Sequence, residues 1–304
     1  MENPLVSIIV CAHRIDRHQD LLDAIDSLKA QSYAPIQIVA IIDGNGRLYA
    51  EIKHLEEDPR ILVILNEKNL GLSGSRNRGL IHAAGDIIAF FDDDAVADEN
   101  WIEELVNMYR RMDAIAAGGC IMPLWLTDEP KCLPGEFYWL IGVTYKGFPE
   151  KVMEVRNTFG SNLSFRADVL KNLGGFRSEM GVKGKGQLQG EETEICERMR
   201  KKFGKGVMYN NKAIIHHKVF PERLRWRFLL NRAFWQGYSK RAMVELGYSL
   251  EDEGKFLSAL RRGAWDRIKI GTFEGYCQLF PLIVLTLAVG SGYAYRVLIS
   301  PLRD

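Results

Sequence analysis

The sequence has few cysteines, and its first residues show no pattern typical of a signal peptide; both observations limit the expected class of protein. Its 304 residues include five cysteines, an odd number, and none of them forms a CxxC pair. We therefore expect buried thiols in a reducing compartment, with neither disulfides nor a zinc site. The opening residues, MENPLVSIIV, carry no basic stretch and no cleavage-type ending. We expect no signal peptide and a cytoplasmic location for most of the chain.

An excess of charge of either sign is also missing. Lysine and arginine number 40 against 39 aspartates and glutamates, which gives a formal net charge of +1. This balance gives no reason to expect nucleic acid as a partner. Hydrophobic residues make up 47% of the chain. That is enough for one large domain with an appendage, or for two modest domains.

One long run contains no charge at all, from Tyr276 to Tyr295. Twenty helical residues rise about 30 Å, the thickness of a bilayer core. Aromatic residues at both ends are typical of membrane interfaces. A proline and two glycines inside the run also fit a buried core helix or a re-entrant segment. We predict a transmembrane segment, and the basic residues that precede it favour a cytoplasmic N-terminal region.

Short apolar runs alternate with helical patterns in the first part of the chain. Strands are predicted at 6–11, 36–42, 61–65 and 86–91. Helices are predicted at 20–30, at 48–55, in a segment that ends at Ala84, and at 101–112. This alternation predicts a parallel sheet between layers of helices, with ligands at the carboxyl ends of the strands. Those ends carry Ala12-His13-Arg14, Asp43-Gly44, Asn66 and an acidic triplet. We therefore predict a nucleotide-type site.

The acidic triplet is Asp92, Asp93 and Asp94, directly after Phe90 and Phe91. Three adjacent carboxylates repel one another and resist desolvation unless a cation or hydrogen-bond donors compensate. Hard oxygen ligands at this spacing suit Mg²⁺ or Mn²⁺, with a phosphate completing the shell. The alternative is a solvated turn before a helix.

No Walker A sequence is present, and no GxGxxG follows the first strand. Instead, Gly71, Gly74 and Gly79 surround Arg76 and Asn77 at the start of a helix. A glycine-rich helix entry with an arginine favours anion binding. An ordinary loop is the alternative.

The alternation stops after Cys120, where prolines and aromatic residues predict an irregular stretch that lines a groove or packs the core. Residues 157–176 then predict a strand, a turn and a short helix. A cationic glycine-rich segment, GVKGKGQLQG, precedes a helix that opens on Glu191 and Glu192. Acids in a first turn are also ordinary partners of the helix dipole. A strand at 213–217 ends in two histidines.

In this order the motifs resemble family 2 glycosyltransferases of the GT-A fold. The resemblance covers residues 4–220 and is carried by VSIIVCAHR, the Asp43-Gly44 strand end, GLSGSRNRGL, IIAFFDDDA, GSNLSFRADVLKNLGGF and GEETEI. Within the family, EFYWLIGVTYKGF, VRNTFGSNLSFR, LQGEETEIC and AFWQGYSKRAM resemble archaeal enzymes that transfer glucuronic acid onto glucosyl-phosphodolichol in N-glycan assembly. The resemblance implies an α/β GT-A domain.

For the donor, the resemblance implies a site at the carboxyl edge of the sheet. Asp43 would face the uracil base, and Arg76 would lie near the diphosphate or ribose. We expect an acidic donor sugar to need a cation, for which Lys183, Lys185 and Arg14 are candidates. The residues assigned to the nucleotide-sugar site are Ala12, Arg14, Asp43, Arg76, Asp92 and Asp93.

For catalysis, the resemblance implies a metal and a single base. Asp94, Asp92 and His217 would bind Mn²⁺ or Mg²⁺ at the donor diphosphate. Glu192 would be the general base, one methylene longer than the family's usual aspartate, and Glu191 is the alternative. Direct displacement inverts the anomeric centre, so an α-linked donor would give a β-linked product.

Two basic amphipathic patterns follow, at 224–238 and 256–268. Helices of this kind lie in the headgroup plane of membranes, although domain-packing helices with solvated basic faces share the pattern. The residues assigned to the acceptor or its lipid phosphate are Lys183, Lys185, Arg232, Lys240 and Arg241.

These predictions divide the chain into a GT-A domain at 1–220, interfacial helices at 221–270 and a transmembrane segment with a short tail at 271–304. The expected activity is metal-dependent, inverting transfer of glucuronic acid from UDP-glucuronate to dolichyl-phosphate-linked glucose. The enzyme would act at the cytoplasmic side of the cell membrane. The alternatives are a dolichyl-phosphate hexose synthase, a polysaccharide glycosyltransferase, and a non-catalytic nucleotide-sugar-binding membrane scaffold.

Overall fold

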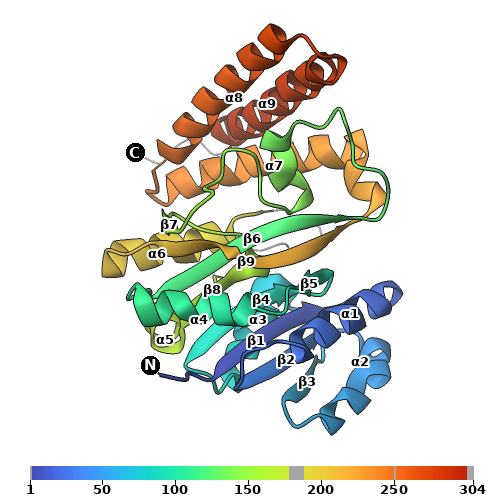
Figure 1. Ribbon diagram of the computed structural model, residues 1–304, viewed down its shortest axis with the longest axis vertical. Helices are drawn as coiled ribbons and strands as arrows, with labels where there is room; N and C mark the ends of the chain where they lie inside the picture. The colour runs from blue at the N-terminus through green and yellow to red at the C-terminus, as the bar shows by residue number, and fades with distance from the viewer. Residues whose placement is uncertain (1, 178–187, 250, 300–304) are drawn as a thin grey trace. The chain divides into compact units, whose positions relative to one another are not determined.

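The computed structural model describes residues 2–177, 188–249 and 251–299 (Figure 1). The chain forms two compact units. The first comprises Met1–Met122, Pro149–Gln187 and Glu191–Lys218, and the second comprises Pro123–Phe148, Leu188–Gly190 and Val219–Asp304. The division at 220 and 270 that we predicted for function remains a prediction.

Four parallel strands begin the sheet of the first unit. They are β1 (Val6–Ala12), β2 (Ile36–Asp43), β3 (Ile61–Asn66) and β4 (Ile87–Asp92), in the order β3-β2-β1-β4. Their register pairs Cys11 with Asp92 and Asp43 with Asn66. Polar groups therefore meet at one edge, as predicted. The predicted strands agree with the observed ones to within one residue at each end.

The other half of the sheet is mixed in direction, so the parallel arrangement predicted from the first four strands ends at β4. The order continues through β8 (Leu163–Arg166), β6 (Ala116–Trp125), β9 (Val207–Val219) and β5 (Ala95–Ala97), while β7 (Met153–Val155) pairs with β9. β8 runs antiparallel to β4 and to β6, and β5 runs antiparallel to β9. β6 replaces the start of the predicted irregular stretch, and β9 is longer than the predicted strand.

Helices cover both faces of the sheet. Phe90 joins a core cluster that contains Leu170 of α5 (Ala167–Leu173) and Ile195 of α6 (Glu191–Phe203). Its neighbour Phe91 points to the other face and contacts Trp101 of α4 (Trp101–Arg111). The helices are α1 (His18–Lys29), α2 (Gly46–Ile52), α3 (Gly71–His82), α4 (Trp101–Arg111), α5 (Ala167–Leu173) and α6 (Glu191–Phe203), with 3-10 turns at Ile15–Arg17, Lys53–Glu57 and Gly160–Asn162.

The second unit is helical. It contains α7 (Trp226–Glu245), α8 (Glu251–Ile270) and α9 (Phe273–Ile299), with 3-10 turns at Gly135–Ile141 and Pro221–Leu224. α7 and α9 touch backbone to backbone at two glycines. A Cβ on Gly237 would collide with the carbonyl of Val289, and one on Gly292 would collide with the carbonyl of Phe234. Only glycine permits so close an approach.

Covalent and ionic contacts also hold the second unit together. Cys132 and Cys277 form a disulfide, so the expectation that all cysteines are thiols is wrong for these two. Their sequence separation of 145 residues hid the pairing. Cys11, Cys120 and Cys196 are free thiols.

Arg267 of α8 donates two hydrogen bonds to Glu136, at 2.8 and 2.6 Å, and both side chains are buried.

By length and composition, α9 is the one helix in the described part of the chain that could cross a membrane. It contains Pro281 and exposes several large apolar side chains, among them Phe280, Leu287 and Leu298. This helix supports membrane association.

Candidate functional site

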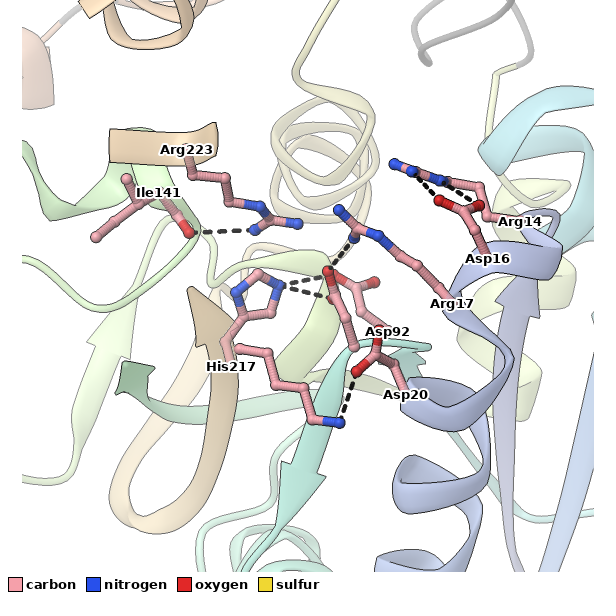
Figure 2. A network of polar contacts seen from close by, with 10 residues as sticks. Arg14, Asp16, Arg17, Asp20, Asp92, Ile141, His217 and Arg223 are labelled. Atoms are coloured by element: carbon pink, nitrogen blue, oxygen red, sulfur yellow. Dashed lines mark hydrogen bonds and ion pairs between the residues drawn. The ribbon is translucent and has the colours of Figure 1, made fainter. Parts of the chain in front are cut away.

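The acidic triplet lies where β4 ends at the carboxyl edge of the sheet. Asp92 is the last residue of β4, and β5 begins at Ala95, which pairs with His217 of β9. This pairing brings the His217 ring to the acids (Figure 2). Its Nε2 lies 3.0 Å from Asp94 Oδ1 and 3.9 Å from Asp92 Oδ2. His216 points elsewhere and contacts Asp98 at 2.9 Å.

Asp92, Asp94 and His217 could hold a metal ion. Each offers one ligand atom, and these atoms all lie within 4.8 Å of one another. Two carboxylates and an imidazole suit Mn²⁺, and the carboxylates suit Mg²⁺ as well. The residues therefore fit the predicted cation, and their role as ligands stays a prediction.

Burial and mutual repulsion shape the acids electrostatically. Burial, together with the charges of Asp94 and Asp92, raises the pKa of Asp93 to about 8. Burial also raises the pKa of Asp92, against the opposing effect of the nearby Arg76 guanidinium. Such shifts indicate a site that needs positive charge when all its acids are ionised.

Arg17 supplies part of that charge, and the sequence analysis missed it. Its Nη1 donates to Asp94 Oδ2 at 2.9 Å, from the 3-10 turn that precedes α1 (Figure 2). In the sequence, the only indication of a role for Arg17 is its place in the polar stretch HRIDRHQD after the first strand. Arg14, the arginine that we selected there, is instead exposed and pairs with Asp16.

Arg76 links the acidic triplet to the glutamates of α6. Its guanidinium lies 3.7 Å from Asp92, 3.3 Å from Glu191 and 3.6 Å from Glu192. The guanidinium carbon also lies 5.7 Å from the centre of the Phe90 ring and 5.3 Å from the centre of the Phe176 ring. Burial alone lowers the pKa of Arg76, but the surrounding carboxylates outweigh burial and raise it. Arg76 is therefore a fixed cation at the centre of the site.

The two glutamates differ in accessibility. The side chain of Glu191 is 6% exposed and hydrogen-bonds to Arg76, whereas that of Glu192 is 22% exposed. An acceptor hydroxyl reaches the more exposed carboxylate more easily. Glu192 is therefore the more accessible of the two candidate bases, and its role stays a prediction.

Gly160 and Asn162 support these side chains, and the sequence analysis gave them no role. A Cβ on Gly160 would collide with the ends of Arg76 and Glu192. Asn162 holds the turn in place, because its amide donates to the carbonyls of Cys120 and Ala213 at 3.0 and 2.9 Å. The motif GSN was visible in the sequence, but these contacts depend on the fold.

Asp43 lies at the same edge of the sheet. Its carboxylate accepts hydrogen bonds from Asn66 Nδ2 at 2.9 Å and from the backbone N–H groups of Leu70 and Gly71 at 2.8 and 2.9 Å. It thus fixes the entry to α3, which carries Arg76. Ala12 is buried at the end of β1. Base and sugar binding by these residues remain predictions.

Three of the residues predicted to hold the acceptor lie on one helix, and their role stays a prediction. Arg232, Lys240 and Arg241 lie on α7 in the second unit. Lys240 contacts Glu253 at 2.6 Å, and the buried Arg241 lies 3.6 Å from Glu245. Lys183 and Lys185 lie outside the described residues.

Comparison with known proteins agrees with this geometry. A family model described as glycosyl transferase family 2 matches residues 7–174. Over 302 residues the chain is 38% identical to the glucosyl-dolichyl phosphate glucuronosyltransferase of Haloferax volcanii, with 96% of each chain covered.

Solved structures show the same fold. A mannosyltransferase from Pyrobaculum calidifontis, in complex with GDP-Man and Mn²⁺, has a TM-score of 0.60 at 14% identity, covering 96% of this chain and 88% of that one. Residues 1–349 of TarS from S. aureus, in complex with UDP, have a TM-score of 0.53 at 15% identity, covering 94% and 90%. The family model spans more than half of this chain, and the Haloferax enzyme aligns along nearly all of it. We conclude that the chain is a glycosyltransferase with the GT-A fold and belongs to glycosyl transferase family 2.

Proposed function

We propose that the enzyme transfers glucuronic acid from UDP-glucuronate to glucose carried on a dolichyl phosphate, as a step of protein N-glycosylation. The observation that carries this proposal is the 38% identity to the Haloferax glucuronosyltransferase across 96% of both chains. An alignment of that extent includes the second unit, where acceptor recognition is expected, as well as the site at the sheet edge.

A divalent ion fits the donor end of the site. Asp92, Asp94 and His217 would hold it, and the complex of the similar mannosyltransferase with Mn²⁺ supports Mn²⁺, with Mg²⁺ as the alternative. When bound, such an ion supplies positive charge that stabilises a departing diphosphate. Arg76, buried and permanently charged, adds a second positive charge 3.7 Å from Asp92.

Glu192 is the proposed base. Its carboxylate takes the proton of the acceptor hydroxyl as that oxygen forms a bond to the anomeric carbon and the bond to the UDP oxygen breaks. Glu191 accepts from Arg76 and thereby keeps the guanidinium beside Glu192. Attack opposite to the leaving group inverts the anomeric centre, so α-linked UDP-glucuronate gives a β-linked product.

A membrane location follows from the lipid-linked acceptor and from α9. We propose that the enzyme works at the cytoplasmic face of the cell membrane. Residues 1–220 would carry catalysis, and residues after 220 would provide contact with lipid and with the lipid phosphate. The apolar surface of α9 supports this division.

The test is transfer by the purified full chain, with a panel of UDP-sugars and GDP-mannose, onto glucosyl-phosphopolyprenol or phosphopolyprenol. We expect product only from UDP-glucuronate with the glucosylated lipid, and none in EDTA until Mn²⁺ or Mg²⁺ is restored. Transfer from UDP-glucose in place of UDP-glucuronate would overturn the donor assignment. Transfer to unglycosylated phosphopolyprenol would instead indicate a dolichyl-phosphate hexose synthase.

A further inference from the structure

α9 exposes large apolar side chains along most of its length, and part of this surface forms an apolar stripe. Phe273, Tyr295, Val297 and Ile299, near the two ends of the helix, are exposed outside the stripe. Five side chains, each about half exposed or more, recur at spacings of three, four or eleven residues, which places them within about 60° around the helix axis. The opposite side of the helix is buried within the second unit, at Leu282, Leu285 and Gly292. The apolar stripe consists of Tyr276, Phe280, Ile283, Leu287 and Leu298.

The buried side of α9 packs on a charged helix. Arg296 donates to Glu245 of α7 at 2.7 Å, and the guanidinium of the buried Arg241 lies over the ring of Tyr293 at 5.9 Å. These contacts surround the close approach at Gly237 and Gly292. α7 and α9 therefore form one packed pair.

A bilayer crossing by α9 would take α7 into the hydrocarbon as well. α7 carries five charged residues along its length, and charged side chains at the bilayer centre are costly. A helix that lies in the surface leaves them at the headgroups. The charged residues of α7 are Arg227, Arg232, Lys240, Arg241 and Glu245.

α8 provides a surface that matches anionic headgroups. Between residues 255 and 270 its exposed side chains include four basic ones, Lys255, Arg261, Arg262 and Lys269, and one acidic one, Asp266. Trp265 and Ile268 are exposed among them, at 58% and 47%. Gly254, Lys255, Ser258 and Arg262 also line an open hollow. Basic and aromatic side chains on one helix face are typical of helices in the headgroup layer.

We infer that α8 and α9 form a one-sided membrane anchor. The apolar stripe of α9 enters one leaflet, the basic face of α8 rests on anionic headgroups, and α9 lies along the membrane surface without crossing it. This arrangement takes the place of the transmembrane segment that the sequence predicts. It requires both ends of α9 to stay on the same side of the membrane. It does not depend on which sugar or lipid the enzyme uses.

The first experiment measures on which side the chain ends. The full chain, with a protease-cleavable tag at each end, is expressed in Escherichia coli, and protease is added to spheroplasts or to inverted membrane vesicles. We expect both tags to be cut in inverted vesicles and neither in spheroplasts. Cleavage of the C-terminal tag in spheroplasts would show a crossing helix and overturn the inference. Detergent-treated samples must show that both tags can be cut.

The second experiment measures lipid binding by flotation of purified protein with vesicles of phosphatidylcholine alone or with 30% phosphatidylglycerol. We expect strong flotation with the anionic vesicles, and at least a tenfold loss for the double change Phe280→Glu and Ile283→Glu. The matched control is Ile81→Glu on α3, an exposed apolar residue of the first unit, which should float like the wild type. Changing Arg261 and Arg262 to Glu should remove the preference for anionic vesicles.

Flotation of the Phe280 and Ile283 variant at the wild-type level would overturn the inference, as would failure of the wild type to float. A melting temperature equal to that of the wild type in detergent must show that the variant is folded, and Leu298→Glu serves as a second variant if it is not. Neither readout uses donor or acceptor. Failure of the anchor and failure of the proposed activity are therefore distinguishable.

Discussion

Arg17 donates a hydrogen bond to Asp94 at 2.9 Å, on the oxygen opposite to the one that His217 contacts at 3.0 Å. The Asp94 side chain is only 4% exposed, whereas that of Arg17 is 19% exposed. In the protein without a bound cation, Arg17 thus provides the positive charge that this buried carboxylate requires. A metal ion at Asp92 and Asp94 and the guanidinium of Arg17 would compete for the same negative charge.

Arg17→Gln should therefore have opposite effects on the fold and on metal binding. In EDTA we expect the free energy of unfolding to fall by about 1–3 kcal/mol, because a charge-assisted hydrogen bond is lost and Asp94 remains buried. With Mn²⁺ the rise in melting temperature should exceed that of the wild type. Thermal melts in EDTA and over a Mn²⁺ series measure both. An equal or smaller rise in the variant would contradict the competition.

Asp94→Asn should remove metal dependence. We expect Mn²⁺ to leave the melting temperature unchanged and transfer to fall by at least about 100-fold, since one of three ligands and its charge are lost. The control is Asp58→Asn, which removes a carboxylate that pairs with Arg60 before β3. That variant should keep both the Mn²⁺ response and the activity. Normal Mn²⁺ stabilisation of Asp94→Asn would place the metal elsewhere.

Glu192→Gln should abolish base catalysis while leaving the fold intact. We expect kcat to fall by about 10²- to 10⁴-fold, with little change in donor KM. Glu191→Gln is the matched control, because Glu191 neighbours Arg76 but is less exposed. Glu191→Gln should clearly lower the free energy of unfolding and should lower kcat only slightly. The reverse pattern would make Glu191 the base.

Gly160→Ala should displace Arg76 and Glu192 from their positions. The added methyl group meets the ends of both side chains, which can move, so we expect loss of activity with only a small loss of stability. Gly46→Ala on α2 is the control, because nothing lies within 4 Å of its added Cβ. Transfer assays and melting curves of both variants test this. Full activity of Gly160→Ala would show that the alignment of these groups is unimportant.

The Glu136–Arg267 pair should make the stability of the second unit depend on pH. Burial raises the pKa of Glu136, but the hydrogen bonds from Arg267 outweigh it and hold the pKa below its ordinary value of 4.5. The pair therefore stabilises the fold fully above that value, and the stabilisation is lost as pH falls through the lower folded-state pKa. Glu136→Gln should cost about 3–5 kcal/mol at pH 7, because Arg267 stays buried without its carboxylate.

Urea denaturation at pH 7, 5 and 4 measures this dependence. The difference between the wild type and Glu136→Gln should shrink at the lowest pH. Glu129→Gln, which changes an exposed acid of the same unit, should show little loss at any pH. A Glu136→Gln deficit that does not change with pH would mean that packing, and not charge, explains it.

The parallel half of the sheet could be predicted because its strands are buried on both faces. Strands such as IQIVAII are nearly continuous apolar runs that are rich in β-branched residues, and their ends indicate the polar edge of the sheet. The pattern draws attention to the acidic triplet, because adjacent carboxylates repel one another unless a positive charge compensates. The assignment of Asp92 and Asp94 as metal ligands rests on the resemblance to family 2 glycosyltransferases and stays a prediction.

The rest of the site depends on contacts that the sequence does not show. β6 begins Ala-Ala-Gly-Gly, which has low strand propensity, yet Gly119 lies so close to Ala213 of β9 that a Cβ would not fit. That close approach is a property of the sheet. The contact between Arg17 and Asp94 is likewise tertiary, across 77 residues of sequence. The stretch HRIDRHQD contains two arginines, Arg14 and Arg17, and only the fold selects Arg17 as the one that contacts Asp94.

The close approach of α7 and α9 at Gly237 and Gly292 also fixes how α9 is rotated about its own axis. One residue inserted between Ile283 and Gly292 would turn everything before it by about 100° relative to the anchored end. Phe280 and Ile283 would then no longer be aligned with Leu298. The number of residues in this segment is therefore as strictly constrained as their apolar character, and a change of length would do more harm than most substitutions there.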